Sequence, residues 1–274
     1  MSTERELFRR RSRFQEIVLC EEDDGHINLT LDGVWQFRSQ EEFIFHELLA
    51  DSPIILAKNL ARVLILGGGD GLAARNVLRY PEVGEVVLCE LDPDVLEMTQ
   101  TVPAMRQLSE DSLADPRVTV VAADALDFIG GDLSTQDVII CDFPAATRDE
   151  LRELFSSNFF SRLLRLAHDD TVIATQISQD PSGFWPIDEA LSHSFSWRMP
   201  LLASLAVPGA GDEEEEGWAD FLVASKRPQE VRRPVAKGAR FLSAERLSRL
   251  EIKNPGESFF QTLEYGEEPD FTAP

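Results

Sequence analysis

The sequence has no apolar run long enough to cross a membrane. No stretch of its 274 residues approaches the ~18 consecutive apolar residues that a spanning helix needs. The first residues, MSTERELFRRRSRF, also lack the apolar core of a signal peptide. We therefore expect a cytoplasmic protein that has no membrane partner.

Cysteine and histidine are scarce as well. Three cysteines, Cys20, Cys89 and Cys141, cannot all pair, and the last two lie in predicted strands, so we expect reduced thiols in a core. The four histidines are scattered along the chain. Neither residue type has the spacing of a metal site, so we predict no metal.

Basic residues are few relative to acidic ones. Lys and Arg number 26 against 49 Asp and Glu, a formal net charge of −23. Nucleic acid is an unsuitable partner, because a duplex requires a basic surface. A small polycation would be attracted, although the same charge also suits plain solubility or a salty cytoplasm. We interpret the short cluster Arg9-Arg10-Arg11 as a solvated N-terminal arm.

What the chain does contain is a glycine turn between two apolar runs, at residues 63–90. The first run enters Gly67-Gly68-Gly69-Asp70-Gly71, a helical pattern follows, and the second run ends at Glu90. Glycines allow a sharp turn that lies against a ligand. An acid about 20 residues further on can accept hydrogen bonds from ribose hydroxyls. This pattern predicts a site for an adenosine-containing cofactor, against the alternative of a glycine-rich turn without a ligand.

The turn also narrows the choice of cofactor. It has no third glycine at dinucleotide spacing, and no Gly-Lys-Ser/Thr follows. Asp70 is a poor neighbour for a pyrophosphate but a good one for a cation, unless it only caps the turn. S-adenosylmethionine and its decarboxylated relative, which carry a sulfonium and an ammonium but no phosphate, satisfy these conditions.

The alternation of strands and helices predicts an α/β fold. Five apolar strands are expected at 63–66, 86–90, 118–122, 138–142 and 172–176, with a further one at 221–224. We predict a Rossmann-like, seven-stranded, mostly parallel sheet with helices on both faces, in a catalytic domain of residues 59–274. Residues 1–58 should form a small antiparallel β-hairpin domain from alternating runs at 14–20 and 27–37, followed by a helix over 40–57.

Polar residues end these predicted strands. Ligands bind at the carboxyl edge of an open parallel sheet, and the residues that fall there are Asp70, Glu90, Asp124, Asp142 and Gln176.

Six motifs, in order over residues 12–260, resemble the spermidine synthase (polyamine aminopropyltransferase) family. They are SRFQEIV, GHINLTLDGVWQFRSQEEFIFHE, GGGDG, CELD with DPRV, DVIICD and WADFLVASK. The resemblance implies a homodimeric enzyme that moves an aminopropyl group from decarboxylated S-adenosylmethionine to an amine and releases methylthioadenosine. That reaction is a direct displacement, and it needs no metal.

The resemblance also implies roles for individual residues. Asp142 would be the catalytic acid that orients and deprotonates the amine, Glu90 would bind the ribose, and Asp124 would bind the adenine amine. Gln15, His46 and Asp70 would surround the aminopropyl tail. The full implied donor site is Gln15, Gln36, His46, Gly67, Gly69, Asp70, Glu90, Asp124 and Ala125, and the implied acceptor site is Asp142, Gln176, Glu215 and Glu216.

The chain departs from the family pattern at the acceptor side. The second acid of D-x-x-D-P is Ala145, the tyrosine of D-E-x-x-Y is Phe45, and the P-T-Y-P-S-G loop is replaced near residues 206–209. We therefore expect an acceptor other than plain putrescine, held by acids such as those at 213–216. The alternatives are a methyltransferase, another alkyl transferase or a cyclase that uses intact S-adenosylmethionine, and a non-catalytic nucleoside-binding homologue.

Overall fold

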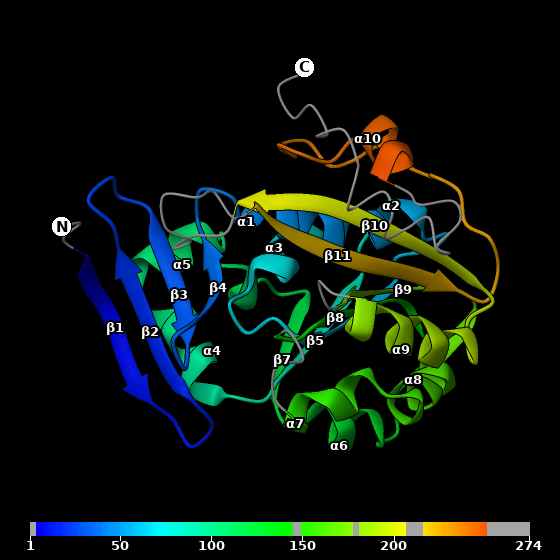
Figure 1. Ribbon diagram of the computed structural model, residues 1–274, viewed down its shortest axis with the longest axis horizontal. Helices are drawn as coiled ribbons and strands as arrows, with labels where there is room; N and C mark the ends of the chain where they lie inside the picture. The colour runs from blue at the N-terminus through cyan, green and yellow to red at the C-terminus, as the bar shows by residue number, and fades with distance from the viewer. Residues whose placement is uncertain (1–3, 145–148, 178–180, 207–215, 251–274) are drawn as a thin grey trace.

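The computed structural model describes residues 4–144, 149–177, 181–206 and 216–250 and contains two sheets. Figure 1 shows a four-stranded antiparallel sheet standing beside a larger sheet that is covered by helices. The predicted fold class is confirmed. The domain boundary at residue 58 stays a prediction.

The small sheet has its strands in chain order: β1 (Arg5–Arg11), β2 (Glu16–Glu21), β3 (Ile27–Leu31) and β4 (Val34–Arg38). Asp32 and Gly33 turn the chain between β3 and β4, both with positive φ (49° and 78°), as the Asp-Gly hairpin signal predicts. One face of this sheet packs against α4 (Pro93–Thr101) and α5 (Pro103–Leu108) through Ile17, Leu29 and Met98.

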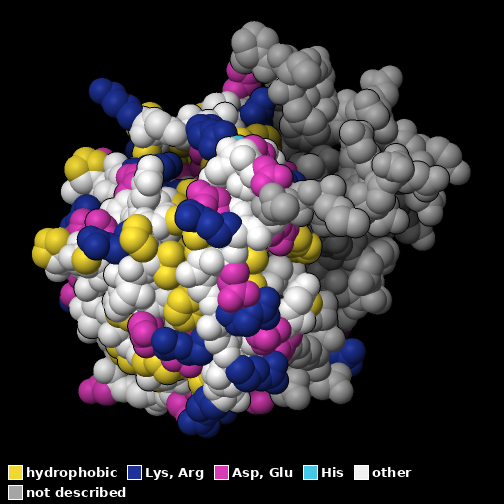
Figure 2. Space-filling view, turned by 90° about the vertical axis from the view of Figure 1, so that its left-hand side faces the viewer, with side chains coloured by type: hydrophobic (Ala, Val, Ile, Leu, Met, Phe, Trp, Pro, Cys, Tyr) yellow, Lys and Arg dark blue, Asp and Glu magenta, His cyan; other side chains and the backbone are white. Residues whose placement is uncertain are grey.

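The interpretation of Arg9-Arg10-Arg11 as an arm was wrong, because these residues belong to strand β1, although their side chains are solvent-exposed as expected. Arg9 pairs with Glu6 and Glu16, and Arg10 reaches Asp94 and Glu97 on α4. Figure 2, which faces this side of the molecule, shows basic and acidic side chains interspersed. The arginines are therefore matched by acids on neighbouring elements, which the local sequence does not reveal.

The large sheet has the order β10-β11-β9-β8-β5-β6-β7. Its parallel strands are β5 (Arg62–Gly67), β6 (Glu85–Glu90), β7 (Val118–Ala122), β8 (Gln136–Asp142) and β9 (Ala167–Ile177). The antiparallel pair β10 (Trp197–Ala206) and β11 (Glu216–Ser225) completes it, and β11 extends beyond the predicted 221–224 at both ends. Side chains alternate between its two faces: Val63 and Ile65 enter one core, Leu64 and Leu66 the other.

Helices and short turns connect the strands and cover both faces of the sheet (Figure 1). The remaining elements are α3 (Leu72–Leu78), η2 (Ser112–Ala114), α6 (Ala125–Ile129), α7 (Asp149–Arg152), η3 (Glu153–Phe155), α8 (Ser157–Leu163), η4 (Leu164–Leu166), α9 (Pro181–Ser192) and α10 (Ala244–Leu250). In the described part of the chain, no helix combines the length and apolarity that membrane crossing requires. The three cysteines are free and buried, as predicted.

The helical stretch before β5 has three parts: α1 (Glu42–His46), a π-helical turn η1 (Glu47–Asp51) and α2 (Ser52–Leu56). Leu48 and Leu49 are fully buried, as predicted, whereas Phe43 is only partly buried against the same core.

The chain after β11 returns to this stretch, and we call its residues 232–242 the C-terminal strap. The backbone N–H of Arg232 donates to the carbonyl oxygen of Ile55. Glu47, which is 1% exposed, accepts backbone hydrogen bonds of 2.7–2.8 Å from Arg240, Phe241 and Leu242. The strap is thereby anchored one residue away from His46.

Candidate functional site

The glycine turn brings the end of β5 against the end of β8. Gly67, Gly68 and Gly71 have φ values of 82°, 70° and 77°, which residues other than glycine rarely adopt. A Cβ at Gly67 would lie 2.0 Å from the backbone oxygen of Asp142, its register partner in β8. Glycine is therefore required here both for conformation and for space.

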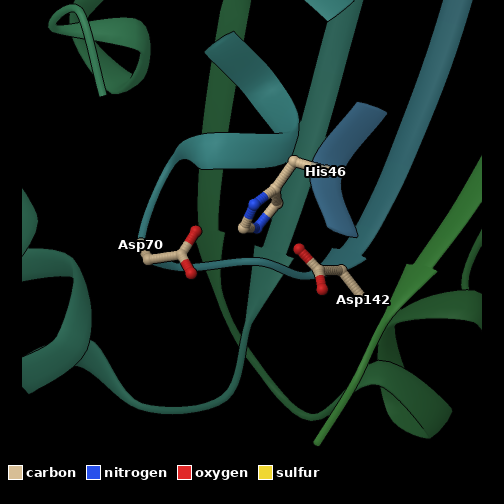
Figure 3. A group of neighbouring side chains, drawn as sticks. All are labelled: His46, Asp70 and Asp142. Carbon is tan, nitrogen blue, oxygen red and sulfur yellow. The ribbon is translucent and has the colours of Figure 1, made fainter. Parts of the chain in front are cut away.

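Three side chains meet at this edge: His46 from the end of α1, Asp70 from the glycine turn and Asp142 from the end of β8. A ring nitrogen of His46 and one carboxylate oxygen of each aspartate all lie within 4.8 Å of one another. Figure 3 shows the imidazole ring pointing into the space between the two carboxylates. We call these residues the His–Asp–Asp cluster.

Asp142 has a carboxylate oxygen with a free bonding position. Its Oδ2 atom is buried and has no hydrogen-bond partner. Burial, together with the negative charge of Asp70, raises the pKa of the Asp142 carboxyl above its ordinary range, against an opposing effect of His46. A buried carboxylate oxygen without a donor is costly, so this atom suits a ligand that brings a donor, above all a cationic one.

His46 is fixed from behind by Glu42, one helical turn earlier on α1. The Nδ1 atom lies 2.7 Å from the Glu42 carbonyl oxygen and 3.0 Å from its Oε2. Glu42 in turn forms a bidentate ion pair with Arg75 of α3, with both N–O distances at 2.8 Å. Sequence reasoning missed Glu42 and Arg75; the spacing of four residues between Glu42 and His46 was the available signal.

Glu90 ends β6 beside the glycine turn. Its Oε2 accepts a 3.1 Å hydrogen bond from the N–H of Gly69, and its Oε1 accepts a 2.9 Å bond from the N–H of Asp92. Burial raises the pKa of Glu90 to about 7. Each carboxylate oxygen keeps a second lone pair, so the side chain can still accept hydrogen bonds from a diol.

Asp92 links Glu90 to the small sheet. Its buried carboxylate accepts hydrogen bonds from Ser12 Oγ at 2.7 Å and from Gln15 Nε2 at 3.1 Å. Gln15 therefore lies next to the turn that follows Glu90. It contacts Asp92 through its amide nitrogen and not through its amide oxygen. Sequence reasoning did not single out Ser12 or Asp92, although Asp92 belongs to the quoted CELD motif.

The other residues predicted for the donor site make local contacts within their own elements. Asp124 caps α6 by accepting hydrogen bonds from the N–H groups of Leu126 and Asp127, and Ala125 is buried behind it. Gln36 Nε2 donates to the Val34 carbonyl oxygen on its own strand.

The acceptor side is only partly described. Gln176 on β9 faces Phe221 on β11 in the sheet register, and the Phe221 ring packs edge-on at 5.0 Å against Phe45. Phe45 also lies 5.1 Å from the His46 ring. Two parts of the predicted acceptor side lie outside the described residues: Ala145, and residues 207–215, which include Glu215. The side chain of Glu216 is not described either. The expectations that rest on them stay predictions.

A cavity of about 470 Å³ opens at the opposite, amino-terminal end of the strands. It is lined by Lys58, Arg62, Asp137, His168 and Arg233 among others. Here Asp137 accepts a hydrogen bond from His168 Nε2 at 3.0 Å and another from the Arg62 N–H at 2.9 Å. This cavity contains none of the residues predicted for the site.

Comparison with known proteins gives one consistent family. The family model described as "Spermine/spermidine synthase domain" matches residues 42–194. A polyamine aminopropyltransferase of Leptospira interrogans is 28% identical over 253 residues, covering 91% of this chain and 49% of the relative. Polyamine aminopropyltransferase 2 of Bacillus cereus is 36% identical over 191 residues, covering 69% and 52%. The chain thus spans about half the length of these curated relatives.

Two solved structures share the fold over nearly the whole chain. A spermidine synthase in complex with the transition-state analogue AdoDATO has a TM-score of 0.81 and 25% identity, covering 96% of this chain and 88% of that one. The spermidine synthase of Thermotoga maritima has a TM-score of 0.76 and 25% identity, covering 96% and 87%.

Proposed function

The chain belongs to the spermine/spermidine synthase family, and from this membership and the geometry of the site we propose that it is a polyamine aminopropyltransferase. It transfers the aminopropyl group of decarboxylated S-adenosylmethionine to a small amine and releases methylthioadenosine. The proposal covers the chain as it stands here, about half the length of its curated relatives.

The observation that carries the proposal is the unpartnered Oδ2 of Asp142, buried opposite Asp70. An amine substrate arrives protonated near neutral pH, and an ammonium group supplies the donor that this oxygen lacks. Asp70, on the other side of the cluster, suits the second ammonium, at the end of the donor's aminopropyl tail. Two carboxylates therefore match two cations.

The nucleoside binds at the neighbouring turn. Glu90 accepts hydrogen bonds from the two ribose hydroxyls with the lone pairs that Gly69 and Asp92 leave free. Gly67 and Gly69 let the backbone approach the donor closely, and Gln15 reaches the same turn through Asp92. Asp124 and Ala125 border the adenine, with Gln36 and His46 completing the donor site.

The chemistry is a displacement at carbon. The donor supplies a methylene group activated by its sulfonium. Asp142 holds the acceptor amine and takes its proton, so that the nitrogen lone pair can form the new C–N bond while the C–S bond breaks and its electrons return to sulfur. The sulfonium is already a good leaving group, so no metal is required.

The acceptor differs from plain putrescine in this proposal. Phe45 brings an aromatic face, without a hydroxyl, beside His46 and Phe221. Gln176, Glu215 and Glu216 are the proposed polar contacts for the far end of the acceptor. The protein acts as a cytoplasmic homodimer that binds neither nucleic acid nor membranes.

Product analysis tests the proposal. The protein is incubated with decarboxylated or intact S-adenosylmethionine and a panel of amines, and nucleoside products are identified by mass spectrometry. We expect methylthioadenosine and an aminopropylated amine, formed only with the decarboxylated donor. S-adenosylhomocysteine from the intact donor would replace the proposal by a methyltransferase, and nucleoside binding without any product would leave a non-catalytic homologue.

A further inference from the structure

A buried ion pair lies directly behind the His–Asp–Asp cluster. The side chains of Glu42 and Arg75 are 3% and 4% exposed, and their contact is bidentate. Arg75 Nε also donates to Asn76 Oδ1, and Nη1 to the Leu108 carbonyl. Because a guanidinium stays protonated in proteins, this geometry requires Glu42 to be a carboxylate.

The charge of Glu42 is strongly favoured. Burial alone would raise the pKa of its carboxyl, but the hydrogen bonds from His46 and Arg75 outweigh burial and lower that pKa to about 2. The ion pair is thus present at any physiological pH. Arg75 donates to both carboxylate oxygens of Glu42, and Oε2 still accepts from His46 with its second lone pair.

His46 Nδ1 faces only acceptors, the carbonyl oxygen and Oε2 of Glu42. This nitrogen therefore carries a proton, and Nε2 is the nitrogen left for the side of the ring that enters the cluster (Figure 3). Asp70 of the glycine turn and Asp142 of β8 are there, both carboxylates. The groups around the ring are thus three acids, the already paired Arg75 and the aromatic ring of Phe45.

This environment favours the charged form of the imidazole. Burial alone would lower the pKa of His46, but the hydrogen bond to Glu42 and the charges of Asp70, Glu42 and Asp142 raise it to about 9. In return, the charge of His46 lowers the pKa of Asp142 against the larger effects of burial and Asp70.

We propose that Glu42 and Arg75 are positioning residues that hold His46 as an imidazolium between Asp70 and Asp142. The inference deepens the aminopropyltransferase proposal and rests on it for its role in turnover. The fixed cation lies beside the two facing carboxylates and favours the ionised form of Asp142. Asp142 is consequently available as a proton acceptor near neutral pH, although its surroundings otherwise favour the neutral acid.

The protonation state can be measured without any substrate. With only four histidines in the chain, His26, His46, His168 and His193, ¹⁵N-edited NMR with single His→Gln variants assigns each ring. We expect His46 of the wild-type protein to titrate near pH 9 with Nδ1 protonated throughout. A His46 that is neutral at pH 7 overturns the inference and leaves the proposed function untouched.

Glu42→Gln tests the positioning role. The amide keeps the size of the side chain and removes its charge, so we expect the pKa of His46 to fall by about one unit or more. An unchanged His46 titration in a folded variant contradicts the proposal.

A second variant and a control protect the experiment against a folding defect. Arg75→Lys keeps the buried positive charge but cannot form the bidentate contact with Glu42. We expect His46 to be held less rigidly, and its pKa to fall less than in Glu42→Gln. Asp137→Asn removes the carboxylate from the other histidine–carboxylate pair, at the opposite end of the strands. It should leave the His46 titration unchanged; an equal shift there would mean that bulk charge, not contact, sets the pKa of His46. If Glu42→Gln does not fold, the wild-type titration and Arg75→Lys decide.

Discussion

The Gly69 N–H donates to Glu90 Oε2 at 3.1 Å, and a Cβ placed on Gly69 would lie 2.6 Å from Glu90 Cγ. The two residues are 21 positions apart in sequence, yet they are in direct contact. The glycine turn therefore helps to set the position of the Glu90 carboxylate.

Gly69→Ala should weaken nucleoside binding, because the new methyl group must displace the Glu90 side chain. The backbone conformation at Gly69 is not strained for alanine, so the protein should still fold. We expect the affinity for methylthioadenosine to drop by about tenfold or more in calorimetry, the equivalent of one charge-assisted hydrogen bond. Gly131→Ala, exposed after α6 and 3.3 Å from the Phe128 carbonyl, is the matched control and should bind normally.

Nucleoside affinity should depend on pH through Glu90. Burial raises its pKa to about 7 in the free protein, whereas two ribose hydroxyls require acceptors and favour the carboxylate. Affinity should therefore fall as the pH drops below about 7, and binding near that pH should release protons. Calorimetry in buffers of different ionisation enthalpy measures the release. Glu90→Gln should bind more weakly and lose the pH dependence; a wild-type affinity that is flat from pH 5 to 8 would remove Glu90 from the ribose.

Asp142→Asn should stop turnover while leaving methylthioadenosine binding intact. The amide preserves shape but cannot accept the amine's proton, so we expect the rate to fall by about 10²–10⁴, the usual range for a general base. Single-turnover kinetics with saturating donor isolates this step. Near wild-type turnover would show that another base operates or that the reaction is a different one.

Asp70 should determine the choice of donor. Its carboxylate attracts the ammonium of the decarboxylated donor and repels the carboxylate of intact S-adenosylmethionine. We expect a preference of about tenfold or more, for which ~1.4 kcal/mol is sufficient, and Asp70→Asn should reduce it. Competition binding with both donors measures the ratio. Equal affinities in the wild-type protein would favour the methyltransferase alternative.

Asp51 should make the protein less stable as the pH rises. Burial raises its pKa to about 7, despite hydrogen bonds from Tyr80 and Asn76, and an unfolded aspartate titrates near ~3.9. The folded state then holds the extra proton, so the contribution is complete below ~4 and is lost as the pH rises through about 7. Asp51→Asn should flatten the curve of unfolding free energy against pH by up to about 1.4 kcal/mol per unit. Urea titrations at intervals from pH 4 to 8 measure this, and an unchanged slope would assign the pH dependence to other groups.

Features with a local signal could be predicted from the sequence. The turn at Gly67–Gly71 needs positive φ at several positions, and only glycine supplies it readily, so the sequence reveals the turn. The parallel strands are short apolar runs bounded by turns, which places their polar ends, Asp142 included, at one edge. That topology places Asp70 and Asp142 near each other. The position of His46 also depends on how α1 packs against the sheet, which the sequence does not reveal.

Features that depend on distant partners could not be predicted. Strand β1 is mostly charged, and it is a strand because its backbone pairs with β2 while Leu7 and Phe8 pack against the core beneath the sheet. Glu42 and Arg75 are 33 residues apart, and nothing near either one indicates the other. The orphaned Oδ2 of Asp142 is likewise a property of the packed site and not of a pattern.

The contact between Glu47 and the C-terminal strap shows that the structural unit extends beyond the segment matched by the family model. The family match covers residues 42–194, but Glu47 takes its three backbone donors from residues 240–242, and Asp92 takes side-chain donors from Ser12 and Gln15. An expression fragment cut at the match boundaries would remove these donors from Glu47 and Asp92 and would also lose β10 and β11. The matched segment therefore takes the partners of two buried carboxylates from residues on both sides of it.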